Sequence, residues 1–125
     1  MAGTESPKGH RFGRKMHLKQ ARDFARVRRD GRRMSCGCFI ANWRLLPPDG
    51  VMRLGIITTK RLGNAVVRAR ARRLLREAFR LHQHDFIQPV DLVLVAQQPI
   101  VGQRLEMVDE AFMAMLRKAR LLKTA

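Results

Sequence analysis

The cations between Lys60 and Arg80 carry the clearest chemistry of this chain. The segment KRLGNAVVRARARRLLREAFR holds eight basic side chains against one acid, Glu77, and seven of the eight cations are arginine. Its hydrophobic residues recur at helical spacing. Like charges three and four residues apart on a helix repel each other, and a solvated helix face ordinarily mixes both signs of charge. A face as one-sided as this one therefore indicates an anionic partner.

A projection of this helix at about 100° per residue separates two faces. The predicted buried stripe consists of Val66, Val67, Ala71, Leu74, Leu75, Ala78 and Leu81. The opposite side, which we call the arginine face, consists of Arg68, Ala69, Arg72, Arg73, Arg76 and Arg80, with Arg70 alone near its other border. A guanidinium group presents a flat fork of donors that matches phosphate oxygens and can stack on a base. The arginine face thus favours a phosphate-bearing partner.

The residues just before the helix add a second feature. Asn64 is a suitable N-cap, and Gly63 separates it from a strand-like run. A strand, a short basic loop and a helix N-terminus would form a phosphate seat, flanked here by Lys60 and Arg61. A plain loop with a good cap explains the Gly-Asn pair equally well.

Other reactive residue types give weaker indications. Cys36 and Cys38 fall in an expected strand without a matching Cys or His pair at zinc spacing, so we expect buried or unreactive thiols. The run His82–Asp85 falls at an expected helix end, where a solvated terminus is the simpler explanation. Glu77 is alone on its helix, and a protein nuclease would need paired carboxylates or a pair of histidines. We predict no catalytic residue and no metal site in the protein itself.

Composition and charge agree with a folded, nucleic-acid-binding chain. The 125 residues are 46% hydrophobic, carry a net charge of +16 and suit one compact domain. Residues 1–80 hold 21 basic and five acidic side chains, whereas residues 81–125 hold five of each. No hydrophobic run approaches the roughly 18 residues of a spanning helix, and the first residues lack the core of a signal peptide. We expect a cytoplasmic location and no membrane partner.

The order of predicted elements gives the fold class. We expect a disordered basic tail over 1–14 and a single domain over 15–125. The elements are a helix from about 18 to 30, strands within 34–46 and 51–59, the basic helix, a buried strand over 91–96 and a final helix within 104–122. The turn Pro47–Gly50 predicts that the first two strands form an antiparallel pair. This αββαβα order predicts an α+β fold with one mixed sheet packed by helices.

The segment KRLGNAVVRARARRLLREAFR closely resembles the signature of the bacterial ribonuclease P protein subunit. The match covers some twenty positions, and the surrounding elements extend the similarity over most of the chain. The resemblance implies a left-handed crossover from the strand before the signature helix to the strand after it. The general rule for such connections would predict a right-handed one.

The resemblance also implies two binding sites. The first would face the catalytic RNA and the phosphates of precursor tRNA, and consists of Lys60, Arg61, Asn64, Arg68, Arg70, Arg72, Arg73 and Arg76. The second, a cleft between the first helix and the sheet, would hold the single-stranded 5′ leader of precursor tRNA and consists of Phe24, Arg28, Ile40 and Asn42. Aromatic rings in such a cleft stack on unpaired bases with little sequence preference. Core packing is an equally good explanation for Phe24 alone.

Three positions depart from the family pattern. Ala69 stands where the family usually has Asn between two arginines. Arg28 and Asn42 stand where the family usually has aromatic residues, and Trp43 is expected on the other face of the strand. The cleft should therefore be more polar than usual, with Arg28 as a cation that can stack on a base.

The function implied is that of a ribonuclease P protein subunit, which supports endonucleolytic removal of 5′ leaders from precursor tRNA. Catalysis is expected to reside in the RNA subunit, with Mg²⁺ bound through that RNA, and no small-molecule ligand is expected. A non-catalytic RNA-binding protein of similar fold, such as a ribosomal component, is the alternative. A nuclease that acts without RNA is a third possibility.

Overall fold

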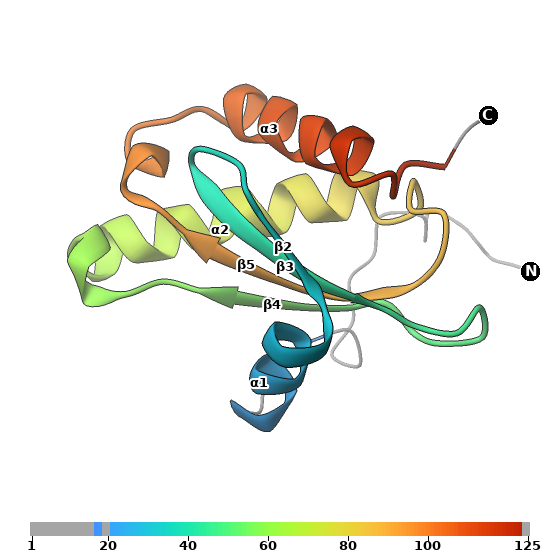
Figure 1. The fold of residues 1–125 in the computed structure, drawn as a ribbon. Coiled ribbons are helices and arrows are strands. Elements are labelled where there is room, and N and C mark those ends of the chain that lie inside the picture. Colours follow the sequence, from blue (N-terminus) through green and yellow to red (C-terminus); the bar gives the residue numbers. More distant parts are fainter. Residues whose placement is uncertain (1–16, 19–20, 124–125) are drawn as a thin grey trace, which may run out of the picture.

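Four strands form one mixed sheet in the order β2-β3-β5-β4 (Figure 1). The computed structural model describes residues 17–18 and 21–123, so the predicted disordered tail at 1–14 lies outside the described residues. The strands are β2 (Arg32–Ser35), β3 (Phe39–Leu45), β4 (Arg53–Ile57) and β5 (Val90–Ala96). The helices are α1 (Ala21–Asp30), α2 (Ala65–His82) and α3 (Leu105–Lys118), with short 3-10 turns at Lys60–Leu62 and Gln98–Ile100. The predicted α+β class is confirmed.

The central strand is β5, which pairs antiparallel with β3 and parallel with β4. The predicted antiparallel pairing across the Pro47–Gly50 turn is therefore wrong, because β5 lies between the two strands that this turn connects. The hydrophobic run of β5 explains the difference. Its residues are almost all buried, and a strand buried on both faces is most stable in the middle of a sheet with a neighbour on each side.

The crossover from β4 through α2 to β5 is left-handed. In Figure 1, β4 and β5 both run to the left, β5 lies above β4, and α2 passes behind them. Turning the view so that the strands point up places β5 to the right of β4 with the helix behind the sheet, which is the left-handed sense. The general rule alone would have given the opposite hand.

The segment predicted to hold one strand holds two. Strands β2 and β3 form an antiparallel hairpin in which Arg33 pairs with Asn42. The connecting residues are Cys36, Gly37 and Cys38, so the expectation that both cysteines lie in a strand is wrong. Gly37 has φ of 82°, a conformation that glycine adopts without steric cost. The hairpin adds an edge strand to the predicted order.

The sheet separates a large core from a small one. Helices α2 and α3 cover one face and enclose the main core with Phe39, Trp43 and Leu92. Helix α1 covers part of the other face, where Leu18, Val27 and Val93 form a second cluster. Because α1 is short, part of that second face stays uncovered.

Helix α2 is rotated relative to the predicted stripe. Val66 and Leu81 are 77% and 37% exposed, whereas Phe79, which the stripe omitted, is fully buried. The ring of Phe79 packs against Phe86 with centroids 6.1 Å apart. Burying this large ring stabilises the helix more than burying Val66 in the first turn would, since stabilisation by burial scales with apolar area. The rotation brings Arg72 to the side of β4.

Candidate nucleic-acid interface

The turn before α2 is built as a helix start with cations beside it. Asn64 accepts a hydrogen bond at Oδ1 from the Val67 amide at 3.0 Å, so the predicted N-cap is confirmed. Gly63 has φ of 151°, and a Cβ there would lie 2.9 Å from the Cβ of Val67. Lys60 and Arg61 lie in the preceding 3-10 turn and are exposed. The structure thus places two flexible cations next to the free amides of a helix N-terminus.

The cations of α2 point in different directions. Arg72 donates from Nη1 to Thr58 Oγ1 at 2.7 Å and, with Arg76, borders a pocket of about 180 Å³ against β4. Arg70 donates to the backbone oxygen of Gln103 at 3.0 Å, on the side of α3. Arg68 stays near the helix start, with its Nε 3.5 Å from the Asn64 carbonyl. The predicted set therefore spreads around the helix rather than pointing one way.

The outermost part of the arginine face is Ala69, Arg73 and Arg76, which are all exposed. Arg80 differs, because Glu77 accepts hydrogen bonds from its guanidinium. Glu77 is the sole acid of α2, as predicted, and it is paired with this arginine. The remaining arginines keep donors available for an external anion.

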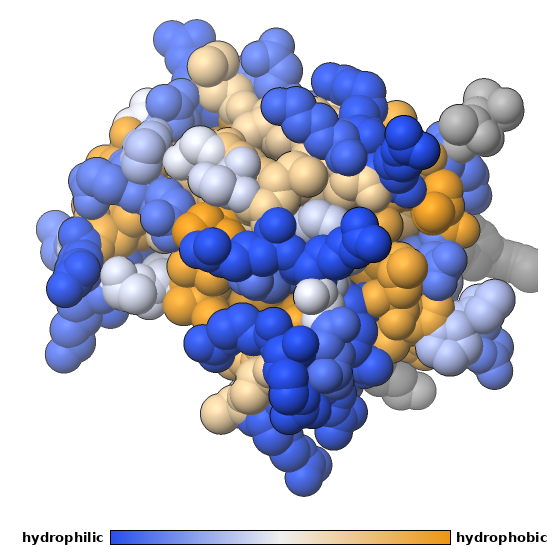
Figure 2. Space-filling model, viewed as in Figure 1, coloured by the Kyte–Doolittle hydropathy of each residue, from blue (hydrophilic) through white to orange (hydrophobic). Residues whose placement is uncertain are grey.

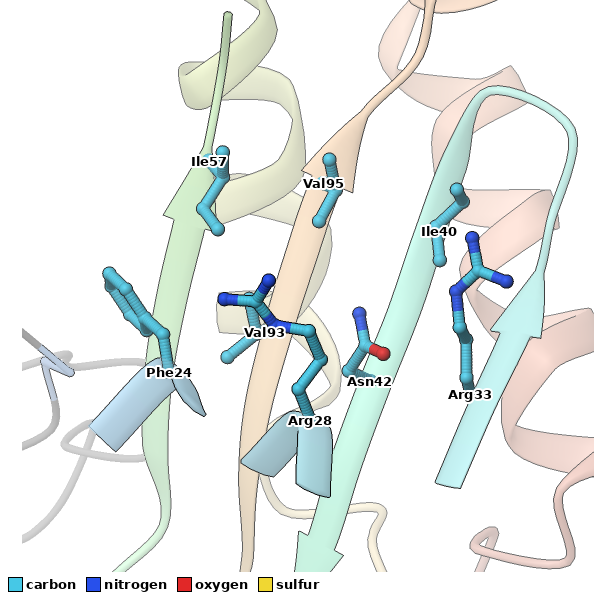
Figure 3. Close-up of a pocket in the computed structure, with 8 residues that line it drawn as sticks. All are labelled: Phe24, Arg28, Arg33, Ile40, Asn42, Ile57, Val93 and Val95. Carbon is cyan, nitrogen blue, oxygen red and sulfur yellow. The ribbon is translucent and has the colours of Figure 1, made fainter. Parts of the chain in front are cut away.

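A cleft lies on the other side of the sheet, between α1 and the strands. Figure 2 shows hydrophilic side chains of α1 and of the strand edge around a band of hydrophobic atoms on this side. The cleft has a volume of about 270 Å³ and is lined by Phe24, Arg28, Arg33, Ile40, Asn42, Ile57, Val93 and Val95 (Figure 3). The structure thus brings together all four residues predicted for it. Strand periodicity could have added Arg33, which pairs with Asn42 on the same face.

Phe24 has both of the roles considered for it. It packs against the small cluster of α1 and also lines the cleft. Its ring crosses β4 at Gly55, where a Cβ would lie only 2.4 Å from Phe24 Cε1. Gly55 therefore allows the ring to approach β4 closely at the border of the cleft (Figure 3).

Polar groups stand at the floor and rim of the cleft. Asn42 is only 6% exposed, and its amide lines the cleft (Figure 3). Trp43, next along β3, is buried on the opposite face as predicted. Arg28 and Arg33 are exposed, and Figure 3 shows both guanidinium groups at the cleft. An occupant would meet a hydrophobic wall, two cations and one amide.

Two charged clusters were missed by the sequence analysis. Asp91 is 1% exposed and binds Arg53 at 2.8 Å and Arg44 at 3.1 Å, which joins β3, β4 and β5. These hydrogen bonds raise the pKa of Arg53. No sequence signal marks this cluster, because it depends on the order of the strands.

The second cluster surrounds His82 at the end of α2. Its Nδ1 lies 2.8 Å from Asp85 and its Nε2 2.6 Å from Asp109 of α3, while the ring stacks on Phe112. The predicted solvated terminus is thus wrong for His82, which ties α2 to α3. Within the described part of the chain, no group of three or more His, Cys, Asp and Glu side chains could hold a metal ion. None of the helices described is long and apolar enough to cross a membrane.

The sequence model of the ribonuclease P family matches residues 12–120. The chain belongs to the ribonuclease P protein family. It is 30% identical over 106 residues to the ribonuclease P protein component of Bacillus velezensis, a match that covers 85% of this chain and 90% of that protein. The ribonuclease P protein component of Desulfatibacillum aliphaticivorans is 36% identical over 93 residues, covering 74% and 77%.

The fold leads to the same ribonuclease P family. The structure of Staphylococcus aureus RNase P protein matches this one with a TM-score of 0.76 and 26% identity, covering 86% of this chain and 98% of that one. RNase P protein from Thermotoga maritima shares the fold, with a TM-score of 0.72 and 24% identity, covering 82% of this chain and 96% of that one. Sequence and fold therefore place the chain among ribonuclease P protein components, as the resemblance of its basic helix predicted.

Proposed function

We propose that this chain is the RNA-binding subunit of ribonuclease P and that it uses two surfaces. The cations around the start of α2 would bind the catalytic RNA and the phosphates of precursor tRNA near the cleavage site. The cleft under α1 would hold the single-stranded 5′ leader. The observation that carries this proposal is the cleft itself: the four predicted residues, two from α1 and two from β3, line one pocket in a member of this family.

The composition of the cleft suits an unpaired strand. One side of the Phe24 ring and the hydrophobic wall offer stacking and packing to bases, worth about 1–3 kcal/mol for each stacked base. Arg28 and Arg33 would neutralise the leader backbone or stack on a base. Asn42 offers two donors and one acceptor to a base edge. One such amide permits a mild base preference, whereas stacking alone would be indifferent to sequence.

The chemistry of cleavage belongs to the RNA in this proposal. The role proposed for the protein is attachment and substrate grip. Mg²⁺ would be bound through the RNA subunit. Because the arginines neutralise phosphates within one ion atmosphere, the protein should lower the Mg²⁺ concentration that the complex needs. We place this activity in the cytoplasm, as the sequence led us to expect.

Reconstitution tests the proposal. Purified protein should leave precursor tRNA intact, and the catalytic RNA with protein should remove the leader at lower Mg²⁺ than the RNA alone. Binding to ribosomal RNA without any effect on leader removal would instead favour the ribosomal alternative. Cleavage by nuclease-free protein without RNA would contradict the assignment of catalysis to RNA.

A further inference from the structure

A second basic pocket lies on the face of the sheet opposite the cleft. It has a volume of about 430 Å³ and lies between the start of β2, the end of β3 and the end of α3. Its lining residues are Asp30, Gly31, Arg32, Trp43, Arg44, Leu45, Ile87, Ala119, Arg120 and Leu121. Successive strand residues point to opposite faces, so Arg33 reaches the cleft while Arg32 reaches this pocket. The two hollows stand back to back across the β2–β3 hairpin.

The charges of this pocket are unbalanced. Arg32 and Arg120 are exposed, and within the described residues neither side chain makes a hydrogen bond or an ion pair. The acid of the pocket, Asp30, is paired with Arg29 at 3.0 Å, and this bond lowers its pKa. Arg44 is engaged by Asp91. Two guanidinium groups are thus available to an anion, and the local acid is already neutralised.

Hydrophobic surface accompanies these cations. Leu45 and Ile87 line the same pocket and are 51% and 49% exposed. Figure 2 shows hydrophobic atoms between the end of α3 and the loop after β3, bordered by hydrophilic side chains. A base or ribose can pack against such a surface while its phosphate meets the arginines. A small inorganic anion would make no use of it.

The backbone of Arg120 gives an independent indication. Arg120 is the sole described residue other than glycine with positive φ, at 59°. It follows the C-cap of α3, and the Leu121 amide closes the helix on the Leu116 carbonyl at 2.8 Å. Glycine is the usual residue at this position, because a Cβ is strained in this conformation. A long cation at a position that favours glycine suggests that the side chain is kept for binding rather than for stability.

We propose that this pocket is a further RNA-binding site, in which Arg32 and Arg120 bind a phosphate and Leu45 and Ile87 pack against the adjoining nucleotide. The inference rests on the proposed function. The phosphate could belong to the catalytic RNA or to a part of the leader that continues past the edge strand β2. Both sources share the same chemistry, and separate measurements distinguish them.

The test compares two double variants of the full chain. Arg32→Gln/Arg120→Gly removes the two free cations of the pocket. Arg117→Gln/Lys118→Gln is the matched control, because it removes two charges from the exposed end of α3 outside the pocket. Affinity and its salt dependence are measured for catalytic RNA binding to protein, and for precursor tRNA with a short or a long leader binding to the reconstituted complex.

The pocket variant should lose roughly tenfold or more in affinity relative to the control, with a salt slope lower by about 0.7–0.9 for each lost phosphate contact. Weaker binding of the catalytic RNA would support the site and identify that RNA as the source of the phosphate. Weaker binding confined to precursor tRNA with the long leader would support the site and identify the leader as the source. Equal affinities and slopes for both variants would overturn it. If the wild-type protein fails to support leader removal at all, the proposed function fails first, and that result is visible before any variant is compared.

A stability measurement separates binding from folding. Arg120→Gly alone should raise the melting temperature by roughly 2–5 °C, because glycine adopts this conformation without strain. Weaker RNA binding by a more stable protein supports a binding role for Arg120. A fall in melting temperature would show that the side chain is structural and would contradict the proposal.

Discussion

At the scale of single residues, the arginines of α2 differ in what holds them. The helical projection placed Arg72 and Arg76 together on a free face, and both border the same pocket against β4. Arg72, however, is also bonded to Thr58, whereas Arg76 is exposed. The sequence could not show this, because it depends on the rotation that Phe79 imposes on the helix.

Arg72→Ala and Arg76→Ala should each weaken binding of the catalytic RNA and lower the salt slope by about 0.7–0.9. Their effects on stability should differ. Arg72→Ala removes the hydrogen bond to Thr58 and should lower the free energy of unfolding by about 0.5–1.5 kcal/mol. Arg76→Ala should change the free energy of unfolding by no more than about 0.5 kcal/mol. Thermal unfolding and filter binding over a salt series measure both quantities, with Arg104→Ala as an exposed control off the arginine face. Unchanged slopes in both variants would show that this face does not contact RNA.

Asn42 offers a test of the proposed leader cleft. Asn42 is only 6% exposed and lines the cleft, so Asn42→Leu should leave the free energy of unfolding within about 1 kcal/mol of the wild-type value. The same change should weaken binding of precursor tRNA by the reconstituted complex several-fold. Tight binding of mature tRNA, which lacks a leader, should be unaffected and serves as the control. Equal loss for both substrates would place Asn42 outside the leader site.

The cysteines of the β2–β3 turn should react slowly. Burial first, and then the neighbouring Cys38, raise the pKa of the Cys36 thiol from its ordinary 9.0 to about 11. In a Cys38→Ser variant, alkylation of Cys36 should accelerate about tenfold per pH unit from pH 7 to pH 10 without reaching a plateau. In the unfolded protein, the alkylation rate of Cys36 should level off near pH 9, the ordinary pKa of the thiol.

The stability effect of this thiol has a defined sign. Because the folded pKa is the higher one, the contribution of Cys36 is complete below about pH 9 and is lost as the pH rises toward 11. A plateau in the alkylation rate of the folded protein near pH 9 would contradict the raised pKa.

At the scale of elements, hydrophobic periodicity predicted the individual helices and strands but not the order of the strands in the sheet. The basic helix, the buried strand β5 and the final helix are confirmed, because each carries a long and consistent hydrophobic repeat. The hairpin at Gly37 was missed because three residues suffice for its turn. The position of β5 between β3 and β4 requires long-range pairing that no local signal records.

The triad of Asp91 with Arg44 and Arg53 is the element-scale feature with the largest expected effect. Asp91→Asn leaves two partly buried guanidinium groups without their anion and should destabilise the fold by about 2–4 kcal/mol. Denaturant unfolding measures this, and Asp49→Asn in the exposed turn is the matched control. A loss no larger than that of the control would mean that the three strands are held together by the main core alone.

At the scale of the whole molecule, the two faces of the sheet differ. One face buries the main core under α2 and α3, and the other leaves the cleft beside the short helix α1. The four cleft residues could be predicted from family resemblance, whereas Arg33 and the pocket with Arg120 required the fold. The same cations that suit RNA repel one another in the free protein, since the net charge is +16.

This repulsion makes the stability of the free protein depend on ions. The Debye length falls below about 10 Å above about 0.1 M salt, so added salt screens the repulsion more strongly. Raising NaCl from about 20 mM to about 300 mM should therefore raise the melting temperature by roughly 3–8 °C. Sodium phosphate or a short RNA at equal ionic strength should raise it further, because a ligand that binds only the folded state adds its binding free energy to stability.

Sucrose at matched osmolality is the control for effects unrelated to charge. Arg72→Ala/Arg76→Ala should reduce the increment from RNA more than the increment from NaCl, because screening acts on all charges while RNA binds at particular ones. A melting temperature that is flat or falling across the NaCl series would show that self-repulsion does not limit the fold. The arginines that are paired with acids would then contribute more to the electrostatic free energy of the fold than the unpaired ones.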